Sequence, residues 1–281
     1  MAVPFVITVA IFLGVLLFLI SQVQSSPGQR SWGRTPRWMK RVRVALATVP
    51  VLITVLVIWA FFVEPSLLVL RQETIRINQW PNELNGLRIA IISDIHVGSR
   101  FIDEDKVRFI VERTNELNPD MVVILGDYIH GGRNSAAVYP ETFAPVLGAL
   151  KAPLGVYSVL GNHDWWWNGD RVRQALVANG IKVLDDEVVE IQHHGRSFWL
   201  AGLADLWTRP QHIDKTIAQI PDGELIIAIT HNPDIFPRVP QRVSLMLAGH
   251  THGGQVQIPI IGSVVQASDY GVRYLRGHVF E

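Results

Sequence analysis

The chain has 281 residues, of which 48% are hydrophobic, and its 25 basic and 25 acidic side chains give a formal charge of zero. This length suffices for one large domain with accessory segments. The neutral balance gives no global attraction for nucleic acid, and the lack of cysteine excludes disulfides and thiolate metal sites.

Two long apolar segments without charged residues occur in the first part of the chain, Val3 to Ile20 and Val44 to Val63. Each is close to the roughly 20 apolar residues that a membrane-spanning helix needs. A cleaved signal peptide is the alternative for the first segment, but no basic side chain precedes it and no clear small-residue cleavage site follows. We therefore predict two transmembrane helices, at about 3–20 and 44–63, in a membrane anchor that covers residues 1–63.

The loop between the two predicted helices, residues 21–43, is strongly basic. Its cationic side chains are Arg30, Arg34, Arg37, Lys40, Arg41 and Arg43. Because basic loops stay in the cytoplasm, we expect a multi-pass protein of the bacterial cytoplasmic membrane, with the domain that follows outside the cytoplasm. The same charges also suit a contact with anionic lipids.

Residues 64–85 are expected to be a linker that includes a first strand, from Leu67 to Ile77, and a turn from Pro81 to Gly86. Beyond it, five short apolar runs each end in Asp, Asn or His. They are Ile89–Ser93, Met121–Leu125, Val156–Leu160, Leu225–Thr230 and Ser244–Ala248. Such β-branched runs are typical of strands that are buried on both faces.

The polar side chains after these runs are expected to meet, because ligands of α/β sheets bind at the carboxyl ends of the strands. They are Asp94, His96, Asp127, Asn162, His163, His231, His250 and His252. In extended backbone, residues i and i+2 point the same way, so His250 and His252 can face one centre. One His-x-His pair is weak support for a metal site, but Asp, Asn or His side chains after five strands together indicate a metal centre.

Helices are predicted between the strands from capping residues, prolines and apolar periodicity. The expected helices begin at Asp103 and end before Asn118, begin at Pro140 and end before Pro153, and span Gly169–Asn179 and, more weakly, Gln211–Ile220. Val188–Gln192 and Ser197–Ala201 are expected to form a hairpin. This order predicts an α/β fold in which two sheets pack face to face with helices outside.

The motifs resemble those of the calcineurin-like metallophosphoesterases over residues 86–281. In the family's order they are Asp94-x-His96, Gly126-Asp127, Gly161-Asn162-His163-Asp164, His231 and Gly249-His250-Thr251-His252. The chain is most similar to the bacterial group in which membrane segments precede this domain. The resemblance implies a four-layer α/β/β/α sandwich preceded by two transmembrane helices. Because relatives usually continue beyond the point where this sequence stops, we expect the second sheet to lack its last strands.

By resemblance, the site holds two divalent metal ions, and oxygen and imidazole ligands suit Mn, Fe or Zn. One ion is expected on Asp94, His96, Asp127 and His252, and the other on Asp127, Asn162, His231 and His250. Asp127 would then bridge the ions, with one carboxylate oxygen for each. Two such ions, roughly 3.5–4 Å apart, activate a water and clamp the phosphoryl group during displacement.

His163 is assigned by resemblance to neither ion and is expected to donate a proton to the leaving oxygen. Asp164 is expected to orient that imidazole. The alternatives are a structural histidine at position 163 and a helix or turn cap at position 164. Trp165-Trp166-Trp167, directly after this motif, suits a substrate cleft, a contact with the bilayer or core packing.

Two branches of the family are disfavoured by departures from their motifs. His130 stands where purple acid phosphatases have a metal-binding tyrosine. Gly131-Gly132-Arg133 stands where protein phosphatases have Asp-Arg-Gly.

The sequence therefore predicts a membrane-anchored phosphoesterase that hydrolyses a phosphodiester, phosphomonoester or pyrophosphate, with a lipid-linked or cell-surface substrate. The enzyme alternative is a UDP-2,3-diacylglucosamine pyrophosphatase, whose reaction at the cytoplasmic face conflicts with the predicted topology. The non-enzyme alternative is a membrane receptor for phosphorylated ligands. We expect the bilayer and the substrate as partners and no nucleic acid, and the oligomeric state stays open.

Overall fold

The computed structural model describes residues 37–78, 80–131, 138–255, 257–258, 262–263 and 265–280. The chain divides into two compact units, Met1–Arg71 and Gln72–Glu281. The predicted helix at residues 3–20 and most of the basic loop lie outside the described residues.

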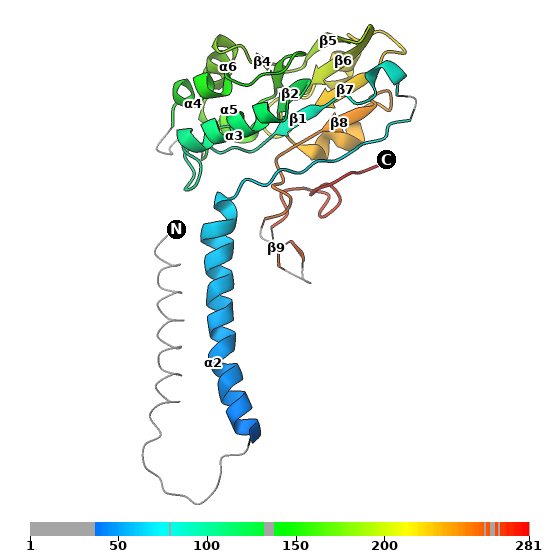
Figure 1. The fold of residues 1–281 in the computed structure, drawn as a ribbon. Helices are drawn as coiled ribbons and strands as arrows, with labels where there is room; N and C mark the ends of the chain where they lie inside the picture. The colour runs from blue at the N-terminus through cyan, green and yellow to red at the C-terminus, as the bar shows by residue number, and fades with distance from the viewer. Residues whose placement is uncertain are drawn as a thin grey trace, which may run out of the picture. The chain divides into compact units, whose positions relative to one another are not determined.

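The described part of the first unit is one long apolar helix followed by an extended segment. It begins as α2, Arg37–Ile58, and continues through a π-helical turn, Trp59–Val63, and a 3-10 turn, Glu64–Ser66 (Figure 1). Its apolar side chains are exposed in the protein alone, as for Leu52 (61%) and Leu56 (65%). By length and composition it is the one helix of the described residues that could cross a membrane. It begins at Arg37, earlier than the predicted start at Val44.

The predicted strand from Leu67 to Ile77 is wrong. The segment pairs with no strand among the described residues, and Val69 and Leu70 are 70% and 63% exposed. Its aliphatic composition favours extended backbone, but a strand also requires a neighbour that supplies hydrogen-bonding partners.

The second unit begins with a 3-10 turn, Asn82–Leu84, and a four-stranded parallel sheet. Its strands, in spatial and chain order, are β1 Ile89–Ile92, β2 Met121–Ile124, β3 Val156–Ser158 and β4 Lys182–Val183. The helices between them are α3 Glu104–Glu116, α4 Pro140–Leu147, α5 Asn162–Trp167 and α6 Gly169–Ala178. As predicted, Asp103 caps α3, where its Oδ1 accepts a hydrogen bond from Lys106 N at 2.9 Å.

The second sheet is mixed and begins with the predicted hairpin. Its strands are β5 Glu187–His193, β6 Arg196–Gly202, β7 Ile226–Ile229 and β8 Leu245–Leu247, in that spatial order. The hairpin is antiparallel, whereas β7 and β8 run parallel to β6. Helix α7, Ile213–Ile217, is shorter than predicted, and a 3-10 helix, η4 Pro233–Arg238, follows β7. A small antiparallel pair, β9 Gln257–Ile258 and β10 Gly262–Ser263, lies beyond β8.

Three buried clusters hold this unit together in layers (Figure 1). Phe143 and Leu176 pack helices α4 and α6 on the outer face of the first sheet. Phe198 and Tyr157 belong to the cluster between the two sheets. Ile217 and Ile235 pack α7 and η4 on the outer face of the second sheet. The layers therefore follow the expected order α/β/β/α.

Burial on both faces holds for some of the five predicted strands and fails for β1. All residues of β2 and of β7 are buried. Strand β1 lies at the edge of its sheet, and its Ile91 is 50% exposed. An apolar run gives strand propensity, but it does not show whether the strand lies inside a sheet or at its edge.

We predict that Phe198→Ala lowers the free energy of unfolding by about 3–5 kcal/mol, because it leaves a cavity between the sheets. Phe109, which is 44% exposed on α3, provides the matched control. Phe109→Ala should cost less than about 1 kcal/mol. Urea unfolding of both variants measures the difference, and equal losses would contradict the sandwich core.

Candidate metal centre

The predicted ligands lie at the carboxyl ends of five strands, of which β1, β2 and β3 belong to the first sheet and β7 and β8 to the second. The site therefore joins the two halves of the domain. Seven of the eight polar side chains gather there in three overlapping groups, of which one, His96, Asp127 and His163, links the other two. The eighth, Asn162, contacts His231 through its amide oxygen.

The first group consists of Asp94, His96 and His252, whose ligand atoms lie within 4.8 Å of one another. The Nε2 atoms of His96 and His252 are 3.1 Å apart, and His252 Nε2 lies 3.5 Å from Asp94 Oδ1. Nitrogen lone pairs this close repel each other unless a proton or a cation lies between them. This group can therefore hold a metal ion.

The second group consists of Asp127, His231 and His250, again within 4.8 Å, and all three side chains are buried. His231 Nε2 lies 3.2 Å from His250 Nδ1 and 3.2 Å from Asn162 Oδ1. The amide oxygen of Asn162 thus joins this group as an uncharged candidate metal ligand.

Asp127 links these two groups through a single oxygen. Its Oδ2 lies 3.6 Å from His96 Nε2 and 3.3 Å from His231 Nε2. Its Oδ1 instead accepts a hydrogen bond from His163 N at 2.9 Å. Oδ2 is therefore the oxygen that faces both neighbouring histidines, and the expectation of one carboxylate oxygen for each ion stays a prediction.

The backbone at the ligands has an uncommon conformation. Five predicted ligands have positive φ: Asp94 (53°), His96 (48°), Asp127 (54°), His250 (71°) and His252 (50°). The left-handed region costs about 1–2 kcal/mol for a residue with a side chain. Such strain persists only where the surroundings enforce it, and it is concentrated at functional sites.

Backbone carbonyls in the loop after β2 orient three of the histidines. The acceptors are Leu125 O for His231 Nδ1 (2.7 Å), Ile129 O for His96 Nδ1 (3.3 Å) and Gly131 O for His163 Nδ1 (2.8 Å). Because Nδ1 donates its hydrogen to a carbonyl in each case, Nε2 is the nitrogen left to face the site. This outer shell fixes the tautomer and the ring orientation that a metal ligand needs.

The histidines differ in how readily they lose a proton. Burial lowers the pKa of His96 and of His250, so both imidazoles are neutral at neutral pH. Burial acts in the same direction on His231, but its hydrogen bond to Asp127 and the nearby carboxylates raise its pKa to about 9. A cation that binds next to His231 would therefore displace a proton.

The donor set fits two divalent cations that share one carboxylate. Residues 87–254 match the family model described as calcineurin-like phosphoesterase. The chain belongs to this family. It is therefore a hydrolase of phosphoester bonds, in a family that uses divalent metals.

Several curated relatives show the same family. The Bacillus subtilis metallophosphoesterase YkuE is 30% identical over 222 residues, which are 78% of this chain and 76% of YkuE. A zebrafish transmembrane protein with metallophosphoesterase domain is 34% identical over 65% of this chain, but the match spans only 44% of that relative. The Escherichia coli phosphodiesterase YaeI is 30% identical over 62% of this chain and 64% of its own length.

The predicted contact between Asp164 and His163 is wrong. Asp164 is fully buried and accepts hydrogen bonds at 2.9 Å from the backbone N–H groups of Gly161, Asp127 and Tyr128. Asp164 is the third residue of α5, so its side chain reaches back to the first turn of the helix. The capping alternative therefore describes this residue, which holds the loop of Asp127 against the start of α5.

Two glycines permit close approach at the ligands. A Cβ on Gly161 would overlap the carboxylate of Asp127, and a Cβ on Gly249 would overlap the Ser93 hydroxyl beside Asp94. In both places a neighbouring side chain takes the space that a Cβ would otherwise fill.

The three consecutive tryptophans separate into two environments. Trp165 and Trp167 pack against the core beneath α5, whereas Trp166 is 44% exposed and its ring lies 4.9 Å from that of His163. Sequence reasoning missed Trp207, whose ring lies 4.3 Å from that of His250 in an edge-on contact. No motif surrounds Trp207, so only the fold could show it.

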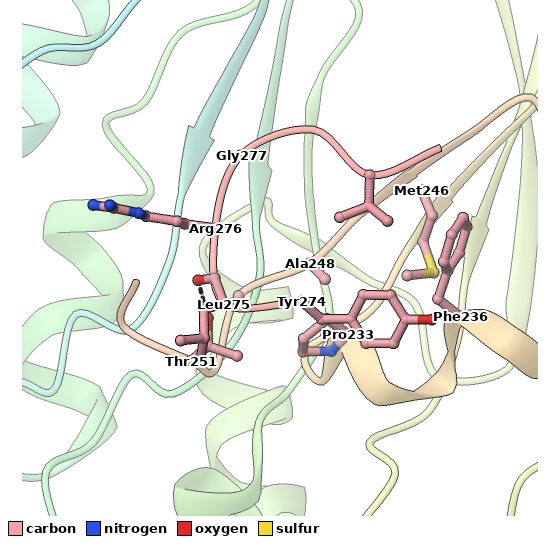
Figure 2. A pocket seen from close by; sticks show the side chains of 11 residues that line it. Pro233, Phe236, Met246, Ala248, Thr251, Tyr274, Leu275, Arg276 and Gly277 are labelled. Carbon is pink, nitrogen blue, oxygen red and sulfur yellow. Dashed lines mark hydrogen bonds between the residues drawn. The ribbon is translucent and has the colours of Figure 1, made fainter. Parts of the chain in front are cut away.

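The end of the described chain folds back onto the loop after β8 (Figure 2). Thr251 Oγ1, next to two ligands, donates a hydrogen bond of 2.8 Å to Leu275 O. Asp234 accepts hydrogen bonds of 2.6 Å from Ser268 Oγ and from Asp269 N. A pocket lies between this segment and η4, with Tyr274 and other apolar side chains in its wall. The C-terminal segment thus supports the loop of His250 and His252 from behind.

We predict that Asp164→Asn lowers both the stability and the metal content of the protein. Each carboxylate oxygen of Asp164 accepts from the backbone, so the amide NH₂ of Asn must face N–H donors in either orientation. The free energy of unfolding should fall by about 2–5 kcal/mol.

The control is Asp103→Asn at the exposed cap of α3, where Asn caps as well as Asp and the effect should be a few tenths of a kcal/mol at most. Urea unfolding and elemental analysis measure both properties. Equal tolerance of the two substitutions would contradict the role assigned to Asp164.

Proposed function

We propose that this protein is a membrane-anchored, dinuclear metal-dependent phosphodiesterase that acts on a lipid-linked or cell-surface substrate. The observation that carries the proposal is the pair of ligand groups that share Asp127 Oδ2, with His163 beside them. The name of the Escherichia coli relative, phosphodiesterase YaeI, supports a diester in preference to a monoester.

In the proposed site, Asp94, His96, His252 and Asp127 would hold one ion, and Asp127, Asn162, His231 and His250 the other. When bound, the two ions would supply a hydroxide nucleophile and neutralise the charge on the phosphoryl oxygens. Burial of the imidazoles and the left-handed backbone at the ligands hold these side chains in place before the substrate arrives. Little reorganisation is then needed during the reaction.

His163 is proposed as the general acid. Its Nδ1–H donates to Gly131 O, so Nε2 is the atom that faces the site. When the ring is protonated, Nε2–H can be donated to the oxygen of the departing alcohol. The ring lies 4.7 Å from that of His96 in an edge-on contact, which places it beside the ligands of the first group.

Membrane attachment is supported by the helix Arg37–Ser66 and by its exposed apolar surface. Relatives from zebrafish and cattle carry the name transmembrane protein with metallophosphoesterase domain. Combined with the basic loop at 21–43, the helix supports a cytoplasmic loop and a catalytic domain outside the cytoplasm.

We predict that Asp127→Ala and His163→Ala separate metal binding from proton transfer. Asp127→Ala removes a ligand from both groups, so metal content and activity should both fall sharply. His163→Ala should keep its metal and still lose roughly 10²–10⁴ in kcat, the usual contribution of a positioned acid.

The loss in His163→Ala should shrink for a nitrophenyl ester, because nitrophenolate departs without a proton. Elemental analysis and rates on esters with a good and a poor leaving group provide the measurements. A metal-free His163→Ala protein would show that His163 is a ligand and would overturn the assignment.

We further predict the sidedness of the domain from thiol labelling, for which a chain without cysteine is well suited. Lys151, an exposed residue of the domain, and Ser26, in the basic loop, are the two sites. In intact cells, a membrane-impermeant maleimide should label Lys151→Cys and should reach Ser26→Cys only after lysis. The reverse pattern would place the domain in the cytoplasm and favour the UDP-2,3-diacylglucosamine pyrophosphatase alternative.

A further inference from the structure

Two exposed tryptophans lie beside the metal centre and come from different halves of the domain. Trp166 is 44% exposed and lies on α5, after β3 of the first sheet. Trp207 is 48% exposed and lies in the loop after β6 of the second sheet. Their ring centroids are 6.3 Å apart and their planes differ by 23°. The two indoles therefore form one nearly continuous aromatic surface.

This aromatic surface borders the reacting groups on both sides. The Trp166 ring contacts the proposed acid, His163, at 4.9 Å, and the Trp207 ring contacts the proposed ligand His250 at 4.3 Å. A phosphoryl group at the ligands therefore has the two indoles within reach of its ester substituent.

The surrounding structure fixes both indoles in their exposed positions. The buried carboxylate of Asp205 accepts hydrogen bonds from Trp207 N (3.1 Å) and Thr208 N (3.0 Å) through one oxygen, which shapes the loop. On α5, Trp165 packs inward, and the guanidinium of Arg209 lies 4.4 Å above its ring. Trp166 is left facing outward.

The chemistry of this surface is apolar. Arg209, the cation of the same loop, lies on Trp165 and pairs with Asp185 at 3.5 Å. Indoles offer large contact areas at a low cost in conformational entropy, because few torsions must be fixed. An exposed pair of indoles next to a polar site therefore favours the binding of a ligand that has both a phosphoryl group and an apolar group.

We propose that Trp166 and Trp207 bind the apolar substituent of the substrate and so determine specificity. The proposal rests on the proposed phosphoesterase function and narrows its substrate class. Either an aromatic ring or an aliphatic chain supplies the required apolar surface, and the experiment distinguishes these two sources.

The test uses methylphosphonate, phenylphosphonate and hexylphosphonate, which share the phosphonyl group and differ only in the substituent. Calorimetry measures their affinities for the full Mn²⁺-loaded chain in lipid nanodiscs, without any need for turnover. We expect the wild-type protein to bind at least one of the two larger ligands about tenfold more tightly than methylphosphonate.

Trp166→Ala and Trp207→Ala should each remove most of this preference and leave the affinity for methylphosphonate and the metal content unchanged. Trp166→Phe and Trp207→Phe should retain most of it, because a smaller aromatic face remains. Phe109→Ala, as exposed as Trp166 but on α3, should have no effect.

A preference for phenylphosphonate alone identifies an aromatic substituent, and a preference for hexylphosphonate alone identifies an aliphatic chain. The proposal is overturned if the wild-type protein binds all three ligands equally. It is also overturned if the alanine variants weaken the binding of methylphosphonate as much as that of the two larger ligands, since the indoles would then only support the histidines.

Separate turnover assays on phosphodiesters test the proposed function itself. A protein that shows the preference but hydrolyses no phosphodiester would refute that function alone.

Discussion

The centre of the structure is one carboxylate oxygen between histidines of two sheets. Asp127 Oδ2 faces His96 on one side and His231 on the other, at 3.6 Å and 3.3 Å. The second oxygen is held by the backbone of His163. Because the loops of both sheets converge on this residue, the position of Asp127 links the packing of the sandwich to the chemistry of the site.

Asp164 supports this arrangement from inside the protein. A buried carboxylate is costly unless several donors compensate it, and Asp164 has backbone N–H donors from two loops. These hydrogen bonds join the Asp127 loop to the start of α5, so the proposed general acid, His163, and the proposed shared ligand, Asp127, are placed by the same contact. The glycine at position 161 is required there, since a larger residue would displace the Asp127 carboxylate.

Most strands and most helices were predictable because apolar periodicity and capping residues are local signals. The convergence of the ligands was predictable because parallel strands end at one edge of a sheet.

The roles of individual atoms in the site were not predictable from the sequence. Left-handed backbone at Asp94 or His250 leaves no compositional signature, and the acceptor role of Asp164 depends on the first turn of α5. Trp207 reaches His250 only through the tertiary fold. The segment from Leu67 to Ile77 has strand composition without a strand partner among the described residues, and no local pattern reveals that difference.

The most direct test is a crystal structure of the Mn²⁺-loaded protein with anomalous scattering from the metal. The proposed arrangement predicts two peaks roughly 3.5–4 Å apart. Both should contact Asp127 Oδ2, one on the side of His96 and His252 and the other on the side of His231 and His250. A single peak, or two peaks that do not share Asp127, would contradict the dinuclear centre.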